Sequence, residues 1–129
     1  AGNHDQAAMA KPLTPAQALA REQAKAKREA LEAALALQLR CERIGATAQH
    51  KFWPGREWRF DFAIEPQRLA IEVQGGIWTN GAHARGAGIT SDCEKAAHAV
   101  IAGWRVIPVT GEQIKSGKAI EWIRRALQS

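Results

Sequence analysis

Residues 59–74, which read RFDFAIEPQRLAIEVQ, constrain the fold more than any other part of this chain. Pro66 has the fixed φ that the second position of a tight turn favours, so residues 65–68 are predicted to reverse the chain direction. The strands on either side of that turn then place Asp61 directly opposite Glu72. Facing Cβ atoms lie about 5 Å apart, and like charges in such positions cost stability. A cation bound between the two carboxylates would remove this cost.

The alternation of apolar and polar residues supports this pairing. The large apolar residues of both strands fall on one face: Phe60, Phe62, Ile64, Leu69, Ile71 and Val73. Asp61 and Glu72 fall on the other face, with Gln74 beside them. A shift of one residue would carry both carboxylates into the core, so the register is well specified. An ordinary solvated face gives the same pattern, so a metal site needs support from outside the hairpin.

The composition limits the class of protein and its partners. A length of 129 residues fits one domain with its own core, and the chain has no apolar run long enough to cross a membrane. A net charge of +5 favours an anionic partner, nucleic acid first. Cys41 and Cys93 are too few for a disulfide framework and lack zinc-ligand spacing. We therefore expect a soluble cytoplasmic protein without a membrane partner.

Residues 14–44 are predicted to form a basic, alanine-rich helix, with Thr14 and Gln17 as its capping box and Gly45 as its C-terminal cap. Its second half is expected to dock on the core through Leu31, Leu35 and Leu39. The first half either is solvated, touches a partner chain, or tracks nucleic acid through its cations Arg21, Lys25, Lys27 and Arg28. Residues 1–13 are expected to be a disordered tail or tag remnant, and residues 45–129 the α/β core.

The core is predicted to continue as three strands, a helix, a strand and a helix. The expected strands are residues 49–53, 58–63, 69–74 and 105–109. Ser91 and Glu94 predict a capping box that starts the next helix, which ends at Gly103. Its expected core-facing stripe is Cys93, Ala96, Ala97, Val100 and Ile101. A final helix is expected around residues 119–127.

This order of elements, with Asp61 on the second strand and Glu72 on the third, resembles the PD-(D/E)XK nuclease superfamily. The stretches RFDFA, IEVQGG, HARGAG, SDCEKAAHA and GWRVIPVT are similar to small phage and prophage endonuclease-like members. They are more distantly similar to very-short-patch repair endonucleases. The resemblance spans roughly residues 40–127. It implies a restriction-endonuclease-like α/β fold, ordered α-β-β-β-α-β-α, with a mixed sheet flanked by helices.

The resemblance also implies a chemistry. Asp61 and Glu72 match the superfamily's acidic ligands for Mg²⁺, which Mn²⁺ could replace. The activity implied is endonucleolytic hydrolysis of DNA phosphodiester bonds, in phage or prophage DNA processing. Many members place another acidic residue near the end of the first core helix, where this chain has Glu42. Glu42 is therefore a candidate third metal ligand, or else an ordinary solvated charge at the helix end.

One position departs from the superfamily pattern. The lysine that usually follows two residues after the glutamate is Gln74 here, which can orient a water but carries no charge. Some relatives supply this lysine from the following helix, where the candidate is Lys95. Lys95 could stabilise developing negative charge, or it is a surface lysine paired locally with Asp92 or Glu94.

The glycine-rich loop that follows the hairpin carries His83 and Arg85. His83 is a candidate general base, phosphate contact or partner of a metal-bound water, and Arg85 is a candidate phosphate contact, so both are predicted to bind DNA. The alternative is a polar connector without a functional role. The loop has no nucleotide-binding fingerprint.

Two other functions fit the same residues. The loss of the usual lysine at Gln74 is compatible with a DNA-binding domain of this fold that has impaired catalysis. The alanine-rich helix is compatible with a structural or assembly protein. A homodimer fits either case, and the sequence identifies no protein partner.

Overall fold

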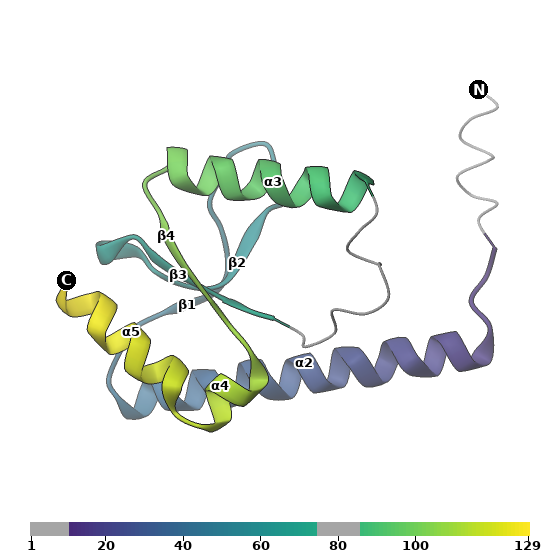
Figure 1. The fold of residues 1–129 in the computed structure, drawn as a ribbon, viewed down its shortest axis with the longest axis horizontal. Coiled ribbons are helices and arrows are strands. Elements are labelled where there is room, and N and C mark those ends of the chain that lie inside the picture. Colours follow the sequence, from purple (N-terminus) through teal and green to yellow (C-terminus); the bar gives the residue numbers. More distant parts are fainter. Residues whose placement is uncertain (1–10, 75–85) are drawn as a thin grey trace.

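The computed structural model describes residues 11–74 and 86–129. His83, Arg85 and residues 1–10 of the expected tail lie outside these ranges. The elements, in chain order, are α2 (Pro15–Cys41), β1 (Thr47–Lys51), β2 (Arg59–Ile64), the 3-10 turn η1 (Glu65–Gln67), β3 (Leu69–Val73), α3 (Gly86–Ile101), β4 (Arg105–Val109), α4 (Gly111–Lys115) and α5 (Lys118–Gln128) (Figure 1). None of the helices in the described ranges is long and apolar enough to span a bilayer.

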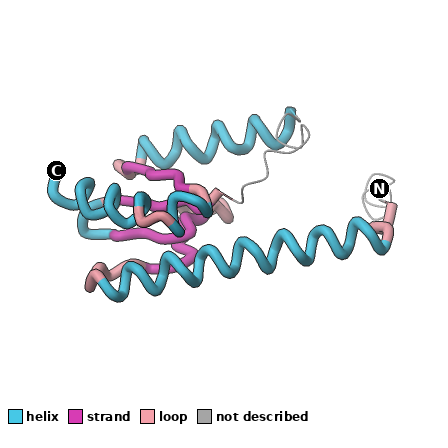
Figure 2. Tube along the Cα trace, turned by 60° about the horizontal axis from the view of Figure 1, so that its bottom comes forward, coloured by secondary structure: helices cyan, strands magenta, loops and turns pink. Residues whose placement is uncertain are grey.

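The four strands form one mixed sheet in the order β1-β2-β3-β4. The first three strands run antiparallel, and β4 pairs with β3 in parallel after the α3 crossover. Helix α3 lies over one face, and α2, α4 and α5 lie over the other (Figures 1 and 2). The predicted mixed α/β fold with helices on both sides of the sheet is confirmed.

The predicted hairpin register is confirmed in the structure. The observed pairs are Phe62 with Ile71, Ala63 with Ala70, and Ile64 with Leu69. The chain reverses through η1, where the Arg68 amide donates to the Glu65 carbonyl at 3.0 Å. Arg68 closes this turn in the left-handed region with φ 51°. The Pro66 turn signal therefore predicted the register correctly.

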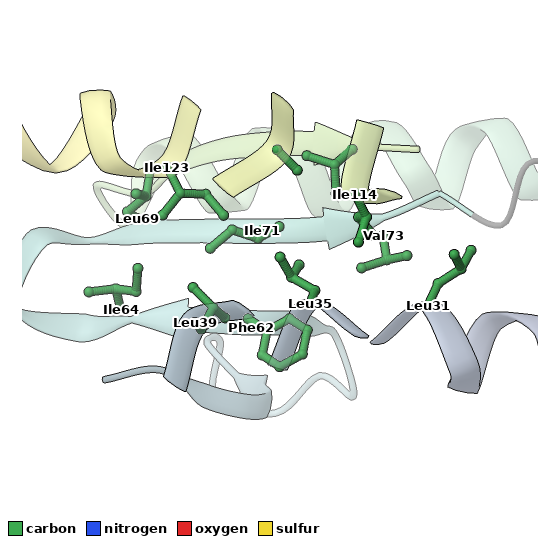
Figure 3. Packing of buried hydrophobic residues seen from close by; sticks show 12 residues of the cluster. Leu31, Leu35, Leu39, Phe62, Ile64, Leu69, Ile71, Val73, Ile114 and Ile123 are labelled. Carbon is green, nitrogen blue, oxygen red and sulfur yellow. The ribbon is translucent and has the colours of Figure 1, made fainter. Parts of the chain in front are cut away.

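The main core lies between the sheet and the helices α2, α4 and α5. Figure 3 shows Leu35 and Leu39 pointing from α2 toward the strands, and Ile114 and Ile123 pointing toward them from α4 and α5. The cluster consists of Leu31, Leu35, Leu39, Phe62, Ile64, Leu69, Ile71, Val73, Val109, Ile114, Ala119 and Ile123.

The alternative that the second face of the hairpin is simply solvated is wrong. Ala63 and Ala70 on the second face are 1% and 0% exposed, because α3 covers them. Phe60 was expected beside Phe62, yet it packs on the α3 side with Trp104. The alternation breaks at Asp61, where the observed strand pairing is interrupted on both sides.

Helix α2 begins as predicted, with the Thr14–Gln17 capping box. Its end differs from the prediction, because the helix stops at Cys41. The residue that takes the left-handed conformation after it is Arg43, with φ 58°, and not Gly45. The Ile44 amide donates to the Leu39 carbonyl at 2.9 Å, which completes a Schellman motif. Ile44 packs against the core at that point, and this apolar contact outweighs the strain at Arg43.

Helix α3 begins at Gly86, so Ser91 lies inside the helix and the predicted capping box is absent. Its predicted core-facing stripe is also wrong: Val100 and Ile101 are 73% and 69% exposed. The opposite side, which holds Lys95 and the buried Ala99, packs on the sheet. The contacts that orient α3 therefore combine the small buried Ala99 with polar and aromatic residues, and not the large aliphatic Val100 and Ile101.

Two caps complete the architecture. Gly103 ends α3 as predicted, with φ 86° and the Trp104 amide donating to the Ala99 carbonyl at 2.9 Å. The short α4 was not expected from the sequence, although its capping box, Thr110 with Gln113, was a readable signal.

Candidate active site

Asp61 and Glu72 meet where the β2–β3 ladder stops. Beyond the Phe62–Ile71 pair, the carboxylates of Asp61 and Glu72 accept hydrogen bonds from backbone amides in place of the ladder's carbonyl oxygens. The Asp61 amide donates to Glu72 Oε2 at 3.3 Å, and the Val73 amide donates to Asp61 Oδ2 at 2.7 Å. Each carboxylate is therefore fixed by the backbone of the opposing strand, which brings the two acidic groups together.

Lys95 contributes a positive charge to these carboxylates from α3. Its ammonium contacts Glu72 Oε1 and lies 5.9 Å from the centre of the Phe60 ring. The side chains of Lys95 and Glu72 are 27% and 18% exposed, so water screens their interaction only in part. The local pairing with Asp92 or Glu94 is not what the structure has, since Glu94 pairs with Arg56 at 3.5 Å.

The surroundings of Glu72 oppose its ionisation. Burial raises the pKa of the Glu72 carboxyl, and the negative charge of Asp61 adds to this, while the hydrogen bond and charge of Lys95 act in the opposite direction. The net effect is a raised pKa. A cation placed near both carboxylates would favour their charged forms and relieve this cost.

Glu32 on α2 is an acidic residue on the Asp61 side of the site that the sequence analysis did not consider, and within the described residues it does not form a metal-holding group with Asp61 and Glu72. Gln49 Nε2 donates to Glu32 Oε1 at 3.2 Å, and the β1–β2 register sets Gln49 opposite Asp61. Burial raises the pKa of Glu32, and the charge of Asp61 raises it further. The signal in the sequence was the position of Glu32 directly after Leu31, at the border of the docked leucine face.

Glu42 does not join this cluster. It lies at the C-cap of α2 and pairs with Arg124 of α5 at 3.6 Å. Ten residues separate it from Glu32, or about 15 Å along the helix. Among residues 11–74 and 86–129, no three or more His, Cys, Asp or Glu side chains form a metal-holding group. The expected ligand set of Asp61, Glu72 and Glu42 is therefore not assembled.

The donor set suits Mg²⁺ in its usual protein coordination. Mg²⁺ prefers oxygen ligands and commonly takes one or two carboxylates, with waters and substrate phosphate oxygens completing its octahedron. Asp61 and Glu72 supply two such carboxylates at one place, both oriented by hydrogen bonds. The pair fits a shared, open metal site rather than a closed protein cage.

Comparison with known proteins identifies the fold. No family model and no curated protein matches the chain. One similar solved structure is described as the catalytic domain of the homing endonuclease I-Bth0305I, with 20% sequence identity and a TM-score of 0.52. The match covers 76% of this chain and 89% of that domain. This similarity shows that the two chains share a fold.

In this fold Gln74 extends the central strand. Its amide donates to the Val109 carbonyl at 2.7 Å, which continues the parallel pairing of β3 with β4. Its half-buried side chain follows Glu72 by two residues, so strand alternation puts both on one face. Gln74 adds hydrogen-bonding groups to the site but no charge.

Aromatic residues support α3 on the side of the sheet that carries Lys95. The His98 ring packs edge-on against Trp53 at 4.5 Å and tilted against Trp58 at 4.9 Å. The Arg56 guanidinium lies 3.8 Å above the Trp58 ring. An open hollow of about 450 Å³ is lined by residues 51–57 and does not include Asp61 or Glu72. These contacts hold α3 in place.

Proposed function

We propose that this protein is a metal-dependent endonuclease that hydrolyses DNA phosphodiester bonds at Asp61 and Glu72. The observation that carries the proposal is the exchange of hydrogen bonds at the end of the β2–β3 ladder, with Lys95 against Glu72. Two like charges are held together there despite their repulsion, which a purely structural role does not require. The fold of a homing endonuclease catalytic domain supports the same chemistry.

Each residue has a distinct task in this proposal. Asp61 and Glu72 would hold Mg²⁺, or Mn²⁺ in its place, and Glu32, whose pKa is raised by burial and by the charge of Asp61, would hydrogen-bond water at the edge of the site. The bound ion supplies Lewis-acid polarisation of the phosphate and lowers the pKa of a water. The Lys95 ammonium neutralises charge that develops on the phosphate oxygens, and the Gln74 amide orients the attacking water.

The direct test compares wild type with Asp61→Asn and Glu72→Gln. Purified protein is incubated with Mg²⁺ or Mn²⁺ and with duplex, single-stranded, nicked and branched DNA. Glu121→Gln is the control, because Glu121 is an exposed carboxylate on α5. We expect both site variants to lose cleavage by at least about 100-fold, with the control unchanged. Metal-dependent cleavage at the wild-type rate by both site variants would refute the proposal.

The second candidate function is a DNA-binding domain of this fold without turnover. Gln74 favours it, because the uncharged amide stands where related nucleases carry a lysine. A titration with divalent ions separates the two functions. A binding domain retains duplex DNA without cutting it at any concentration of Mg²⁺ or Mn²⁺. Phage or prophage DNA processing remains a prediction based on sequence resemblance alone.

A further inference from the structure

Helix α2 extends well beyond the part that packs on the core. Leu31 is the first of its buried leucines, and residues 15–30 before it are exposed apart from the half-buried Ala24. Figures 1 and 2 show this half projecting past the edge of the sheet. We refer to residues 15–30 as the α2 arm. The α2 arm consists largely of good helix formers, so it can be helical without packing, and its exposed charged side chains are free to contact a partner.

Three cations of the α2 arm align with the candidate active site. Arg21, Lys25 and Arg28 precede Glu32 at intervals of four, three and four residues. At about 100° per residue, all four side chains fall within an arc of about 60°. We call the three cations the arm stripe. Of the buried leucines of α2, Leu39 falls within this arc, Leu35 lies about 20° outside it and Leu31 about 60° outside it, so the arm stripe overlaps one border of the core-facing side of α2.

The arm stripe is available to an anion. All three side chains are exposed, and within the described part of the chain none of them forms an ion pair. Residues 11–30 hold five Lys and Arg against two Glu. Repulsion among these cations lowers the stability of the free arm and would be relieved by a row of phosphates.

Resting on the function proposed above, we propose that Arg21, Lys25 and Arg28 bind the phosphate backbone of duplex DNA on one side of the scissile bond. A helix rises 1.5 Å per residue, so Arg28, Lys25 and Arg21 lie about 6, 11 and 17 Å along the axis from Glu32. Duplex DNA rises 3.4 Å per base pair, so the arm stripe reaches about five base pairs from the active site.

A protein partner fits this surface less well. A stable protein interface has an apolar centre, often aromatic. The arm's exposed large apolar residue, Leu19, is 59% exposed and lies on the opposite side of the helix from the arm stripe. Lys27 also lies outside the stripe. Cations in one line suit a linear polyanion.

The test uses two variants that each remove three positive charges. The arm variant is Arg21→Gln/Lys25→Gln/Arg28→Gln. The control variant is Lys27→Gln/Lys118→Gln/Arg125→Gln, which changes exposed cations off the stripe and on α5. Glutamine favours helix about as well as lysine, so circular dichroism should show equal helix content. Fluorescence anisotropy then measures the Kd for a 30-base-pair duplex without divalent ions, over a range of salt concentrations.

Loss of three phosphate contacts should reduce the slope of log K against log salt by about 2.7. At about 0.15 M salt this corresponds to roughly 100-fold weaker binding by the arm variant, and the control should change its slope by less than about 1.

The outcomes separate this inference from the proposed function. Equal slopes for the arm variant and wild type, or equal losses in both variants, overturn the inference while cleavage by wild type stands. A changed sedimentation coefficient of the arm variant with unchanged DNA binding also overturns it, in favour of a protein contact. Absence of DNA binding by wild type overturns the proposed function itself.

Discussion

Replacing Lys95 with methionine tests whether the ammonium on α3 acts in place of the lysine that the superfamily resemblance predicts at position 74, where this chain has Gln74. The substitution keeps the length and apolar stem of the side chain and removes its charge. We expect the single-turnover rate of DNA cleavage to fall by about 100-fold. Binding of Mn²⁺ should not weaken, because the remaining carboxylates then carry a larger net negative charge.

The magnitude follows from the position of the ammonium. The Lys95 ammonium and a negative charge developing on a phosphate oxygen about 4 Å away would interact by about 4 kcal/mol at the effective dielectric constant of a protein surface. Lys95 is 27% exposed, so solvent screening reduces this to about 2–3 kcal/mol. Each 1.36 kcal/mol of transition-state stabilisation is tenfold in rate, which gives a loss of about 100-fold. Removal of an oxyanion-stabilising donor has an effect of similar size in other enzymes.

The assay measures cleavage under single-turnover conditions with saturating Mn²⁺, and metal affinity separately by titration. Lys118→Met is the control, since Lys118 is an exposed lysine on α5. The double variant Gln74→Lys/Lys95→Met returns a lysine to the face of β3 that carries Glu72. It should recover at least tenfold of the lost rate. Thermal unfolding checks that each variant remains folded.

Two results would contradict this reasoning. A cleavage rate for Lys95→Met equal to that of Lys118→Met would show that the ammonium has no part in the reaction. A rate loss explained wholly by weaker Mn²⁺ binding would make Lys95 a positioning residue for Glu72 instead.

Three further predictions concern other parts of the molecule. Glu32→Gln should weaken Mn²⁺ binding about tenfold in a titration, and Glu42→Gln should match wild type; the reverse order would restore the sequence-based assignment. Burial raises the pKa of Glu72 in the folded state above its pKa in the unfolded state. Protonation of Glu72 therefore adds to the free energy of unfolding. This contribution is complete at a pH below the unfolded-state pKa and is lost as the pH rises through the folded-state pKa. In metal-free urea unfolding from pH 4 upward, Glu72→Gln should flatten that decline, and an unchanged slope would contradict the assigned environment. Arg43→Gly should raise the free energy of unfolding by about 1 kcal/mol and Gly103→Ala should lower it by about 1 kcal/mol, because both positions have left-handed φ; urea unfolding with the opposite signs would refute the cap assignments.

The sequence predicted the hairpin because its information is local. Pro66 sets the turn, and a turn at residues 65–68 pairs Asp61 with Glu72, although the alternation itself breaks at Asp61 and Phe60 packs on the other face. A capping box also fixed the start of α2. In each case, neighbouring residues contain the whole physical reason for the structure.

The acidic residue contributed by α2 could not be predicted in this way. Leucine periodicity gives the docked face of the helix but not which turn lies beside the hairpin. Gly111 at the start of α4 settles that, because a Cβ there would lie 2.9 Å from Leu31 Cδ2. This close approach fixes α2 along its axis, so that Glu32, rather than Glu42, lies close enough to feel the charge of Asp61.

The orientation of α3 was misread for a related reason. Val100 and Ile101 are the large apolar residues at the end of that helix, so hydrophobic periodicity selected their side as the buried one. The observed side is chosen by Lys95 against Glu72 and by His98 among tryptophans. These contacts join residues that are far apart in the chain, so the periodicity of apolar residues within one helix cannot predict them.

The same hydrogen-bond exchange that joins the carboxylates also holds the sheet together at that point. The amide of Val73 depends on Asp61, and the amide of Asp61 depends on Glu72. Truncation to alanine would leave these part-buried N–H groups unpaired at about 1–3 kcal/mol each. Asparagine and glutamine keep an acceptor oxygen and remove the charge. Loss of cleavage in those variants therefore reports on metal and charge, because the strand geometry that positions both residues is retained.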